Sequence, residues 1–279
     1  MILAACFVKK KDCALSLFYV NIVVKKLKWL QVKHEEERGC FMEQKKEMLE
    51  KIQVMSGAKL KYIAFLSMLI DHINKALIYP NINGRLLLII SDLFDIMGRI
   101  AFPIFMFLLV EGYFKTKNKW KYLGYLIVFG IISEIPFDLF TTGTFYSPNW
   151  NNIMFTLALT MVTIWMIDTL KEKKMYKLIY YLLTLVILTV SCYVSSACGL
   201  DYDYHAILVG YFFYVFHEKP IYTVLFGYLS IYKEPWALLG FGLNLTYNGE
   251  RGRQNKLLNY CFYPGHLLIL GLLRMYFKI

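Results

Sequence analysis

The chain has 279 residues, of which 58% are hydrophobic and only 18% are charged. Soluble domains carry about 25% charged residues, so this composition excludes an ordinary water-soluble globular protein. The net charge of +11 would suit a nucleic-acid-binding protein. The basic residues, however, stand in short loops between apolar runs, as in membrane proteins, and this argues against nucleic acid as a partner.

Residues 1–55 differ from the rest and are expected to be an N-terminal extension. The apolar part of residues 2–24 is interrupted by charges, unlike a secretory signal peptide. The run Glu36–Gly39 would be written in purine-rich codons that can spell a bacterial ribosome-binding sequence, and Met42 follows at a suitable distance. Two interpretations stay open. Either translation starts at or after Met42 and residues 1–41 are upstream DNA, or this part is an amphipathic surface segment.

Residues 56–279 contain successive apolar runs and are interpreted as one domain. A helix needs roughly 20 residues to cross a hydrocarbon core about 30 Å thick. Three of the runs are shorter, which predicts tilted, re-entrant or buried helices. The expected fold is therefore an all-α, polytopic transmembrane bundle of eight or nine spans in a lipid bilayer. The runs lie near 60–79, 86–114, 120–140, 151–170, 175–198, 203–217, 220–232, 235–247 and 257–277.

The placement of basic residues predicts an orientation in a bacterial cytoplasmic membrane. If all nine runs span and the N-terminus is inside, most loop lysines and arginines are cytoplasmic, as the positive-inside pattern requires. The outer loops then hold chiefly Arg85 and Lys233.

The first run carries a candidate catalytic pair, Asp71 and His72. Ionisable residues inside a membrane helix are costly and are functional candidates. Histidine suits a general base because its ordinary pKa is near 6.5. Lys61 precedes His72 by eleven residues, which places both on one helix face about 16 Å apart. The alternative for Asp71 is an ion pair with a neighbouring helix.

The second run carries Asp92, Asp95 and Arg99 on one helix face. Asp95 and Arg99 have the spacing of an i,i+4 ion pair. Arg99 is a candidate for stabilising a developing oxyanion, and the two aspartates are candidates for binding an acceptor. A self-neutralising group of charges that faces the bundle is the alternative.

A second group of acceptor-binding candidates follows at the end of the third run. Glu134 and Asp138 flank Pro136, which is expected to break or kink the helix beside a cavity. Asn152 opens the next run and joins this group, and helix capping is the alternative for it.

The loop before the last run is basic and glycine-rich. Arginine binds phosphate in a bidentate way and glycine lets backbone amides approach an anion, so the loop suits a phosphorylated ligand. Ordinary positive-inside charge is the alternative. The candidates for this cofactor-binding group are Arg251, Arg253 and Lys256, with Tyr263 and His266 just beyond them and Lys61 on the first run.

Other site types receive no support from the sequence. The six cysteines form no CxxC pair and no metal-type spacing with histidine, so no metal is expected. The patterns of a P-loop, of a GxSxG or HExxH hydrolase and of a Rossmann fold do not occur.

Several motifs, in order, resemble the TraX family of membrane proteins over nearly all of residues 58–279. They are M-L-I-D-H at 68–72, G-R-I-A-F-P-I-F at 98–105, V-E-G-Y at 110–113, S-E-I-P-F-D at 133–138, N-I-M-F-T-L at 152–157, D-Y-H-A-I-L at 203–208, N-G-E-R-G at 248–252 and F-Y-P-G-H-L at 262–267. The resemblance implies N-terminal acetylation of a conjugative pilin. It also implies a relation to the multispanning acyltransferases of the acyltransferase-3 type, in which an arginine precedes a histidine by the spacing of Lys61 and His72. Lysine here keeps the charge but loses the bidentate fork.

The resemblance and the residues together predict a membrane-embedded acyltransferase. It would use acetyl-CoA or another acyl-CoA, bound by the basic loop, to modify an extracytoplasmic pilin, peptide N-terminus or glycan hydroxyl. His72 would be the base, with Asp71 and Arg99 beside it. The alternatives are an ion-coupled secondary transporter, which intramembrane carboxylates also suit, and a non-catalytic membrane component of a conjugation or secretion system.

Overall fold

The computed structural model describes residues 47–48, 51–173 and 175–277, with the side chain of Lys256 left out. The chain forms two units, residues 1–52 and residues 53–279. Of the first unit only four residues are described, so both interpretations of residues 1–41 fall outside the described part. The rest of this section concerns the second unit, here called the helical domain.

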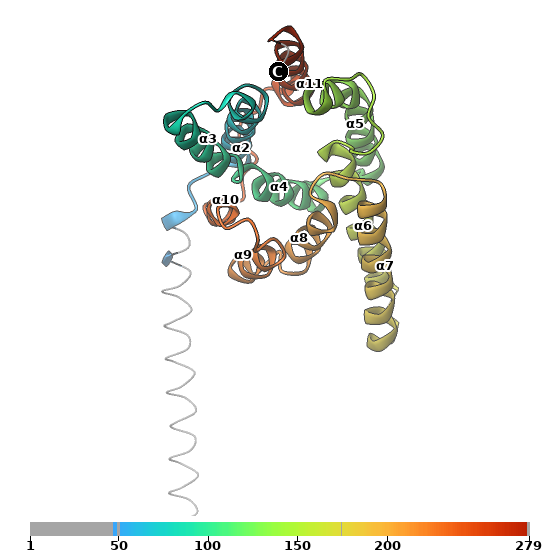
Figure 1. The fold of residues 1–279 in the computed structure, drawn as a ribbon. Helices are drawn as coiled ribbons and strands as arrows, with labels where there is room; N and C mark the ends of the chain where they lie inside the picture. Colours follow the sequence, from blue (N-terminus) through green and yellow to red (C-terminus); the bar gives the residue numbers. More distant parts are fainter. Residues whose placement is uncertain (1–46, 49–50, 174, 278–279) are drawn as a thin grey trace, which may run out of the picture. The chain divides into compact units, whose positions relative to one another are not determined.

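The described residues of the helical domain form ten α-helices, which lie close to the predicted apolar runs (Figure 1). In chain order they are α2 (Gly57–Ile73), α3 (Arg85–Gly98), α4 (Ala101–Lys115), α5 (Lys119–Thr142), α6 (Ile153–Glu172), α7 (Lys177–Ala197), α8 (Asp203–Val215), α9 (Pro220–Leu229), α10 (Ala237–Asn244) and α11 (Lys256–Phe277). A π-helical turn over Asn74–Ile78 continues α2.

Four helical segments in the described part are long and apolar enough to cross a membrane, judged by length and composition. They are Arg85–Lys115, Lys119–Thr142, Ile153–Glu172 and Lys177–Ala197. Exposed apolar side chains such as Leu182, Leu185 and Val186 cover α7, as expected for a surface in contact with lipid. The fold is therefore that of an all-helical membrane protein, as predicted, while the count of eight or nine spans stays a prediction.

The apolar run at 86–114 is two helices rather than one. The helix stops after Gly98 and restarts at Ala101. Ser67 of α2 donates hydrogen bonds to the carbonyls of Met97 and Gly98, which satisfies the end of α3. On the other side, a Cβ on Gly240 of α10 would come within 2.5 Å of the Ile100 carbonyl oxygen. The break is thus held by close packing from two helices.

The expected break at Pro136 does not occur, because α5 runs continuously from Lys119 to Thr142. A proline removes one N–H donor from a helix. Pro136 is buried, and α11 packs along α5. Packing therefore holds the helix together where the local sequence predicts an interruption.

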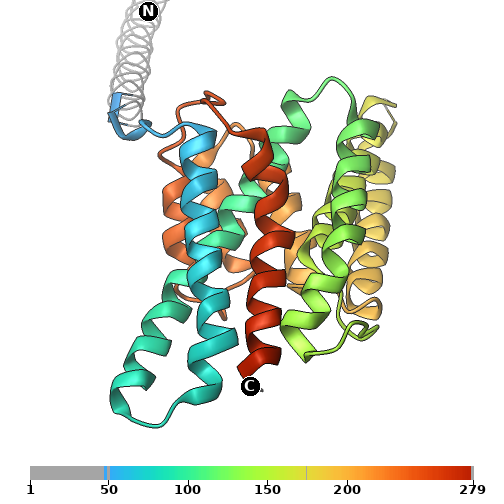
Figure 2. The same ribbon diagram turned by 90° about the horizontal axis from the view of Figure 1, so that it is seen from above.

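The helices run between two ends, which Figure 2 shows as the upper and lower ends of the domain. The upper end, here called the basic end, carries the start of α2, the connection 116–118 and the loop 245–255. The lower end carries the π-helical turn, the connections 143–152 and 198–202, and the end of α11. Backbone contacts join the parts of each end. The Gly57 N–H donates to the Glu250 carbonyl at 2.8 Å, and the Asn151 N–H donates to the Gly199 carbonyl at 2.9 Å.

Candidate functional site

A large cavity runs through the helical domain between α2, α4, α5 and α11, which surround the central space in Figure 1. Its volume is about 1260 Å³. Its lining includes Gly57 at the start of α2 and Lys75 in the π-helical turn. These positions are about 27 Å apart at the ~1.5 Å rise of a helix, close to the ~30 Å thickness of a hydrocarbon core. The cavity therefore follows α2 from one end of the domain to the other.

The part of the cavity at the basic end is lined by cations. These are Lys61, Lys115, Lys117, Lys121 and Arg251. Lys115 pairs with Glu111 at 2.9 Å, and Lys61 donates to the Gln254 amide oxygen at 3.2 Å. Lys117, Lys121 and Arg251 have no carboxylate within ion-pair distance among the described residues. This end of the cavity is thus an electropositive mouth suited to an anionic ligand.

The predicted basic loop contributes to this mouth in part. Lys61 and Arg251 line the cavity, whereas Arg253 is exposed and lies outside its lining, and the Lys256 side chain is outside the described part. The loop docks on α2, where the Ala58 N–H donates to the Arg251 carbonyl at 3.0 Å. Gly252 makes this possible, since it has φ +70° and a Cβ there would come within 2.4 Å of the Ser56 Oγ.

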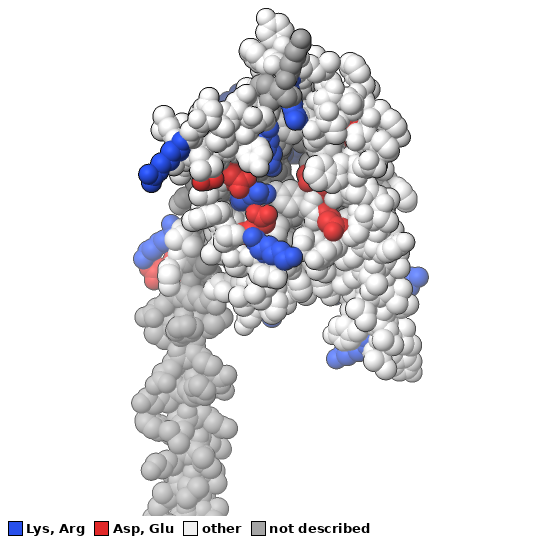
Figure 3. Space-filling model, in the orientation of Figure 1, with Lys and Arg blue, Asp and Glu red and all other residues white. Residues whose placement is uncertain are grey.

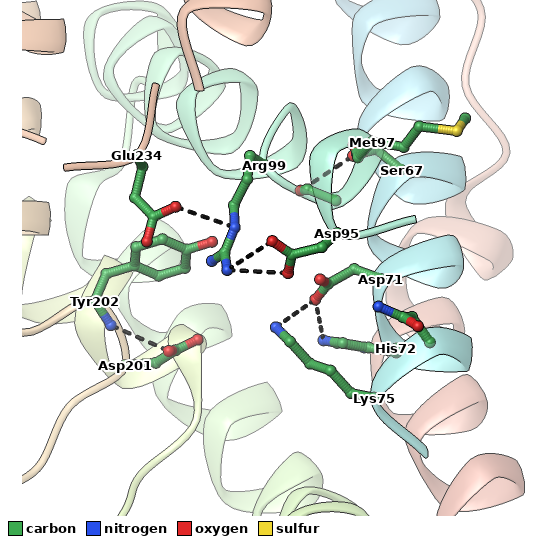
Figure 4. Close-up of polar contacts among 12 residues, drawn as sticks. Ser67, Asp71, His72, Lys75, Asp95, Met97, Arg99, Asp201, Tyr202 and Glu234 are labelled. Atoms are coloured by element: carbon green, nitrogen blue, oxygen red, sulfur yellow. Dashed lines mark hydrogen bonds and ion pairs between the residues drawn. The ribbon is translucent and has the colours of Figure 1, made fainter. Parts of the chain in front are cut away.

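Charged side chains of both signs gather at the opposite part of the cavity. Figure 3 shows acidic and basic groups around a hollow near the centre of one face of the domain. The Arg99 guanidinium pairs with Asp95 at 3.0 Å and with Glu234 at 3.1 Å, and Lys75 pairs with Asp71 at 2.7 Å (Figure 4). We call Asp71, Lys75, Asp95, Arg99, Asp201 and Glu234 the carboxylate cluster. The predicted pair of Asp95 and Arg99 is present, and the break after α3 directs Arg99 into the cavity.

His72 lines the cavity beside this cluster, but sequence reasoning missed its hydrogen-bond partner. The Nδ1 of His72 lies 2.8 Å from the Nε2 of His266 on α11. The Nε2 of His72 lies 3.9 Å from Asp71 Oδ2. His266 was expected with the phosphate-binding loop, and the structure instead places it against the candidate base. Tyr263, one turn earlier on α11, does line the cavity.

The predicted acceptor-binding residues are dispersed. Asp92 is exposed and lies outside the cavity lining, as do Glu134, Asp138 and Asn152. Asn152 is fully buried, caps α6 through the Met154 N–H, and contacts the Glu134 carboxylate of α5. Asp138 accepts from the Ser147 N–H at 2.9 Å. These contacts fasten α5 to the start of α6, so the capping alternative describes Asn152 well.

Other residues of the cavity wall were not predicted. Asp201 and Tyr202, in the connection 198–202, join Lys75 and Glu234 there. Tyr202 has φ +62° and stacks on Phe102 with ring centroids 3.8 Å apart. Burial raises the pKa of Asp201 from 3.8 to about 6. Asp201 and Asp203, at the start of the sixth apolar run, were the available signal, but the fold of this connection cannot be derived from local sequence.

The arrangement can bind an anion at the basic end, and at the opposite end it holds a candidate base beside groups that can bind a polar or cationic ligand. Within the described residues, no group of three or more potential metal ligands occurs.

Comparison with known proteins gives two matches. The profile of the TraX protein family matches residues 56–274. A protein of Dichelobacter nodosus, described as "Probable fimbrial assembly protein FimC, serogroup H1", is 32% identical over 122 residues, which cover 39% of this chain and 45% of that protein. The aligned segment thus spans less than half of this relative. No solved structure matches the chain.

Proposed function

This chain belongs to the TraX family, and we propose that it is a membrane-embedded acyltransferase. In this proposal it takes an acyl group from acyl-CoA, bound at the basic end, to an acceptor bound at the carboxylate cluster. The single observation that carries the proposal is the continuous cavity, which connects an electropositive mouth to His72. The relation to acyltransferases of the acyltransferase-3 type, suggested by the spacing of Lys61 and His72, is part of the proposal.

The electropositive mouth fits the donor. The phosphates of acyl-CoA would meet Lys117, Lys121 and Arg251, which have no carboxylate partner among the described residues. Arg251 offers a bidentate fork for one phosphate, while lysines act as point charges. The apolar wall formed by Phe105, Phe129 and other side chains suits the pantetheine arm between the mouth and His72.

The reaction would proceed by direct transfer. The acceptor amine or hydroxyl attacks the thioester carbonyl carbon, and His72 Nε2 takes the acceptor proton as the new bond forms. Arg99 stabilises the negative charge on the carbonyl oxygen. The carbon–sulfur bond then breaks, and the protonated imidazole gives its proton to the departing CoA sulfur. Asp71 stabilises the transient imidazolium, since its carboxylate lies 3.9 Å from Nε2.

We propose an acceptor site different from the one that the sequence predicted. We assign it to Asp201 and Tyr202 in place of Glu134, Asp138 and Asn152, because only the former two line the cavity. A carboxylate there favours a peptide or pilin N-terminal amine over a glycan hydroxyl. The fimbrial name of the D. nodosus relative supports a pilin-like acceptor.

We further propose nine passes through a bacterial cytoplasmic membrane with the N-terminus inside. The contacts at the two ends support this topology. Lys119, at the start of α5, pairs with Asp168 near the end of α6, and His205, early in α8, contacts the Ser230 carbonyl after α9. Successive helices, with α3 and α4 counted as one pass, thus alternate in direction. The basic end would then be cytoplasmic.

The direct test uses protein purified into nanodiscs, radiolabelled acetyl-CoA and a peptide with a free N-terminal amine. Wild type should label the peptide. His72→Ala should reduce the rate by 10²–10⁴-fold, the usual cost of losing a general base. Asp92→Asn is the matched control, because it alters an exposed residue outside the cavity. A His72→Ala rate within tenfold of wild type would sink the proposed role.

A second candidate is an ion-coupled transporter. The observation that favours it is the length of the cavity, which reaches both ends of the domain, with partly exposed ion pairs near one end. Flux of an amine or peptide into liposomes without any acyl-CoA would support transport. Thermal stabilisation by acetyl-CoA that Arg251→Gln abolishes would support the enzyme. A non-catalytic component of a conjugation or pilus system would show neither.

A further inference from the structure

The imidazole rings of His72 and His266 lie edge to edge in nearly the same plane. The ring planes differ by 6° and the centroids are 5.0 Å apart, while Nδ1 of His72 lies 2.8 Å from Nε2 of His266. When two coplanar imidazole rings face each other through nitrogens 2.8 Å apart, their centroids are expected to be 5.0 Å apart, as observed. Imidazole N–H bonds and lone pairs lie in the ring plane, so this is a well-aligned hydrogen bond.

The second nitrogen of His266 decides which atom carries the proton. Its Nδ1 lies 2.6 Å from the Phe262 carbonyl oxygen, one turn earlier on α11. A carbonyl only accepts, so His266 Nδ1 must be protonated and donate. His266 is buried at 8% exposure, and no carboxylate lies within ion-pair distance of it among the described residues. A charge there would be uncompensated, which favours the neutral ring with a bare Nε2.

The proton of the His72–His266 bond then belongs to His72. Since His266 Nε2 accepts, His72 Nδ1 donates, and neutral His72 keeps Nε2 unprotonated. That nitrogen faces the carboxylate cluster (Figure 4). The titratable and charged groups around the pair are Asp71 from α2, Lys75 from the π-helical turn and Tyr263 from α11. From α5 the neighbour is the Phe140 ring, 4.8 Å from His72.

We propose that His266 is a positioning residue that fixes His72 in the tautomer with a bare Nε2 directed into the cavity. The contribution of His266 to catalysis rests on the proposed function. Only the tautomer with a bare Nε2 can accept a proton from a group bound beside Asp71. The tautomer itself is a property of the resting protein and does not depend on any substrate.

Two nearly isosteric variants separate the roles of the two His266 nitrogens. In His266→Gln the amide oxygen can occupy the place of Nε2 and accept from His72. In His266→Asn the shorter amide can replace Nδ1 and donate to the Phe262 carbonyl, but it cannot reach His72. Neither variant adds volume at the site, and thermal unfolding of both checks that they fold.

The first measurement is the nitrogen NMR spectrum of protein labelled with 15N-histidine, in nanodiscs without substrate, with His72→Gln identifying the His72 signals. We expect a protonated Nδ1 and a bare Nε2 in wild type and in His266→Gln. In His266→Asn we expect a mixture of tautomers. A bare Nδ1 on His72 in wild type would overturn the proposal.

The second measurement is acyl transfer as a function of pH. We expect His266→Asn to lower kcat by at least tenfold with little change in either KM, while His266→Gln stays within about fivefold of wild type, because wrong tautomers remove the base without altering binding. Equal loss in both variants contradicts the proposal. If wild type shows the expected tautomer but transfers no acyl group, the proposed function fails and the positioning role stands.

Discussion

Gly98 of α3 lies so close to Asp71 of α2 that a Cβ on residue 98 would come within 2.4 Å of the Asp71 Cβ. This approach holds the end of α3 against α2, so that Arg99 and the candidate base occupy the same cavity. The close approach of α3 to α2 beside the Asp71 carboxylate therefore depends on the missing side chain of Gly98.

Gly98→Ala should push α3 away from α2. We expect a loss of about 1–3 kcal/mol in the free energy of unfolding, the usual cost of overpacking. Thermal unfolding in nanodiscs measures it. Gly124→Ala is the control, because no atom lies within 4 Å of a Cβ there. An alanine inside a helix is worth ~0.5–1 kcal/mol over glycine, so the control should be unchanged or more stable. Equal unfolding temperatures in the two variants would contradict the close contact.

Asn152→Ala should destabilise the protein without changing acceptor binding. It removes the cap of α6 and the bonds of a fully buried amide to Glu134 and Gly130. We expect a loss on the order of 2–4 kcal/mol in the free energy of unfolding. Asp201→Asn should show the opposite pattern, with a raised KM for the acceptor peptide. A raised acceptor KM in Asn152→Ala would restore the original acceptor prediction.

Asp201 should make stability depend on pH. Burial raises the pKa of its carboxyl from 3.8 to about 6 in the folded protein. Ionisation is thus less favourable in the folded than in the unfolded chain, so this residue's stabilising contribution is present below pH 3.8 and is lost as the pH rises through about 6. The difference in unfolding temperature between wild type and Asp201→Asn should shift against wild type across this window and stay level above pH 7. A difference that is constant with pH would show that Asp201 is not buried.

Gly252→Ala should detach the basic loop from α2. The added Cβ would collide with Ser56 Oγ, and Gly252 also has φ +70°. We expect the KM for acyl-CoA to rise at least fivefold while kcat changes little, because Arg251 leaves the mouth of the cavity. Gly249→Ala is the matched control, since it has φ +81° but open space around a Cβ. If both variants behave alike, backbone strain rather than the Ser56 contact is responsible.

The positions of the helices could be predicted because each apolar run must be helical to satisfy its backbone in lipid. Local pattern also predicted the Asp95–Arg99 pair, which needs only helical spacing. It failed where packing between helices decides. The run at 86–114 contains Pro103, which a single helix would hold in its interior, so the sequence carried a signal for an interruption. The position of the break, after Gly98, depends on Ser67 and Gly240 from other helices.

In the candidate site, too, local sequence predicted some residues, while others depend on packing between helices. His72 was found because a histidine beside an aspartate is unusual in an apolar run. Its partner His266 is 194 residues away along the chain, and no spacing rule connects them. Glu134 and Asp138 were expected in a cavity for their chemistry, yet the helix rotation turns them toward the 143–152 connection. Tyr202 takes a left-handed backbone conformation that its sequence does not indicate.

A cavity that follows α2 for its whole length also has an electrical consequence. In the proposed orientation it lies across a membrane in which each transported charge gains about 2.3 kcal/mol per 100 mV. A water-filled path of that length would discharge the membrane. The carboxylate cluster would counter this, because the pairs of Lys75 with Asp71 and of Arg99 with Glu234 hold each charge beside its counter-charge at the cavity wall. Under the proposed function, the protein has to limit the passage of ions while it lets one chemical group pass.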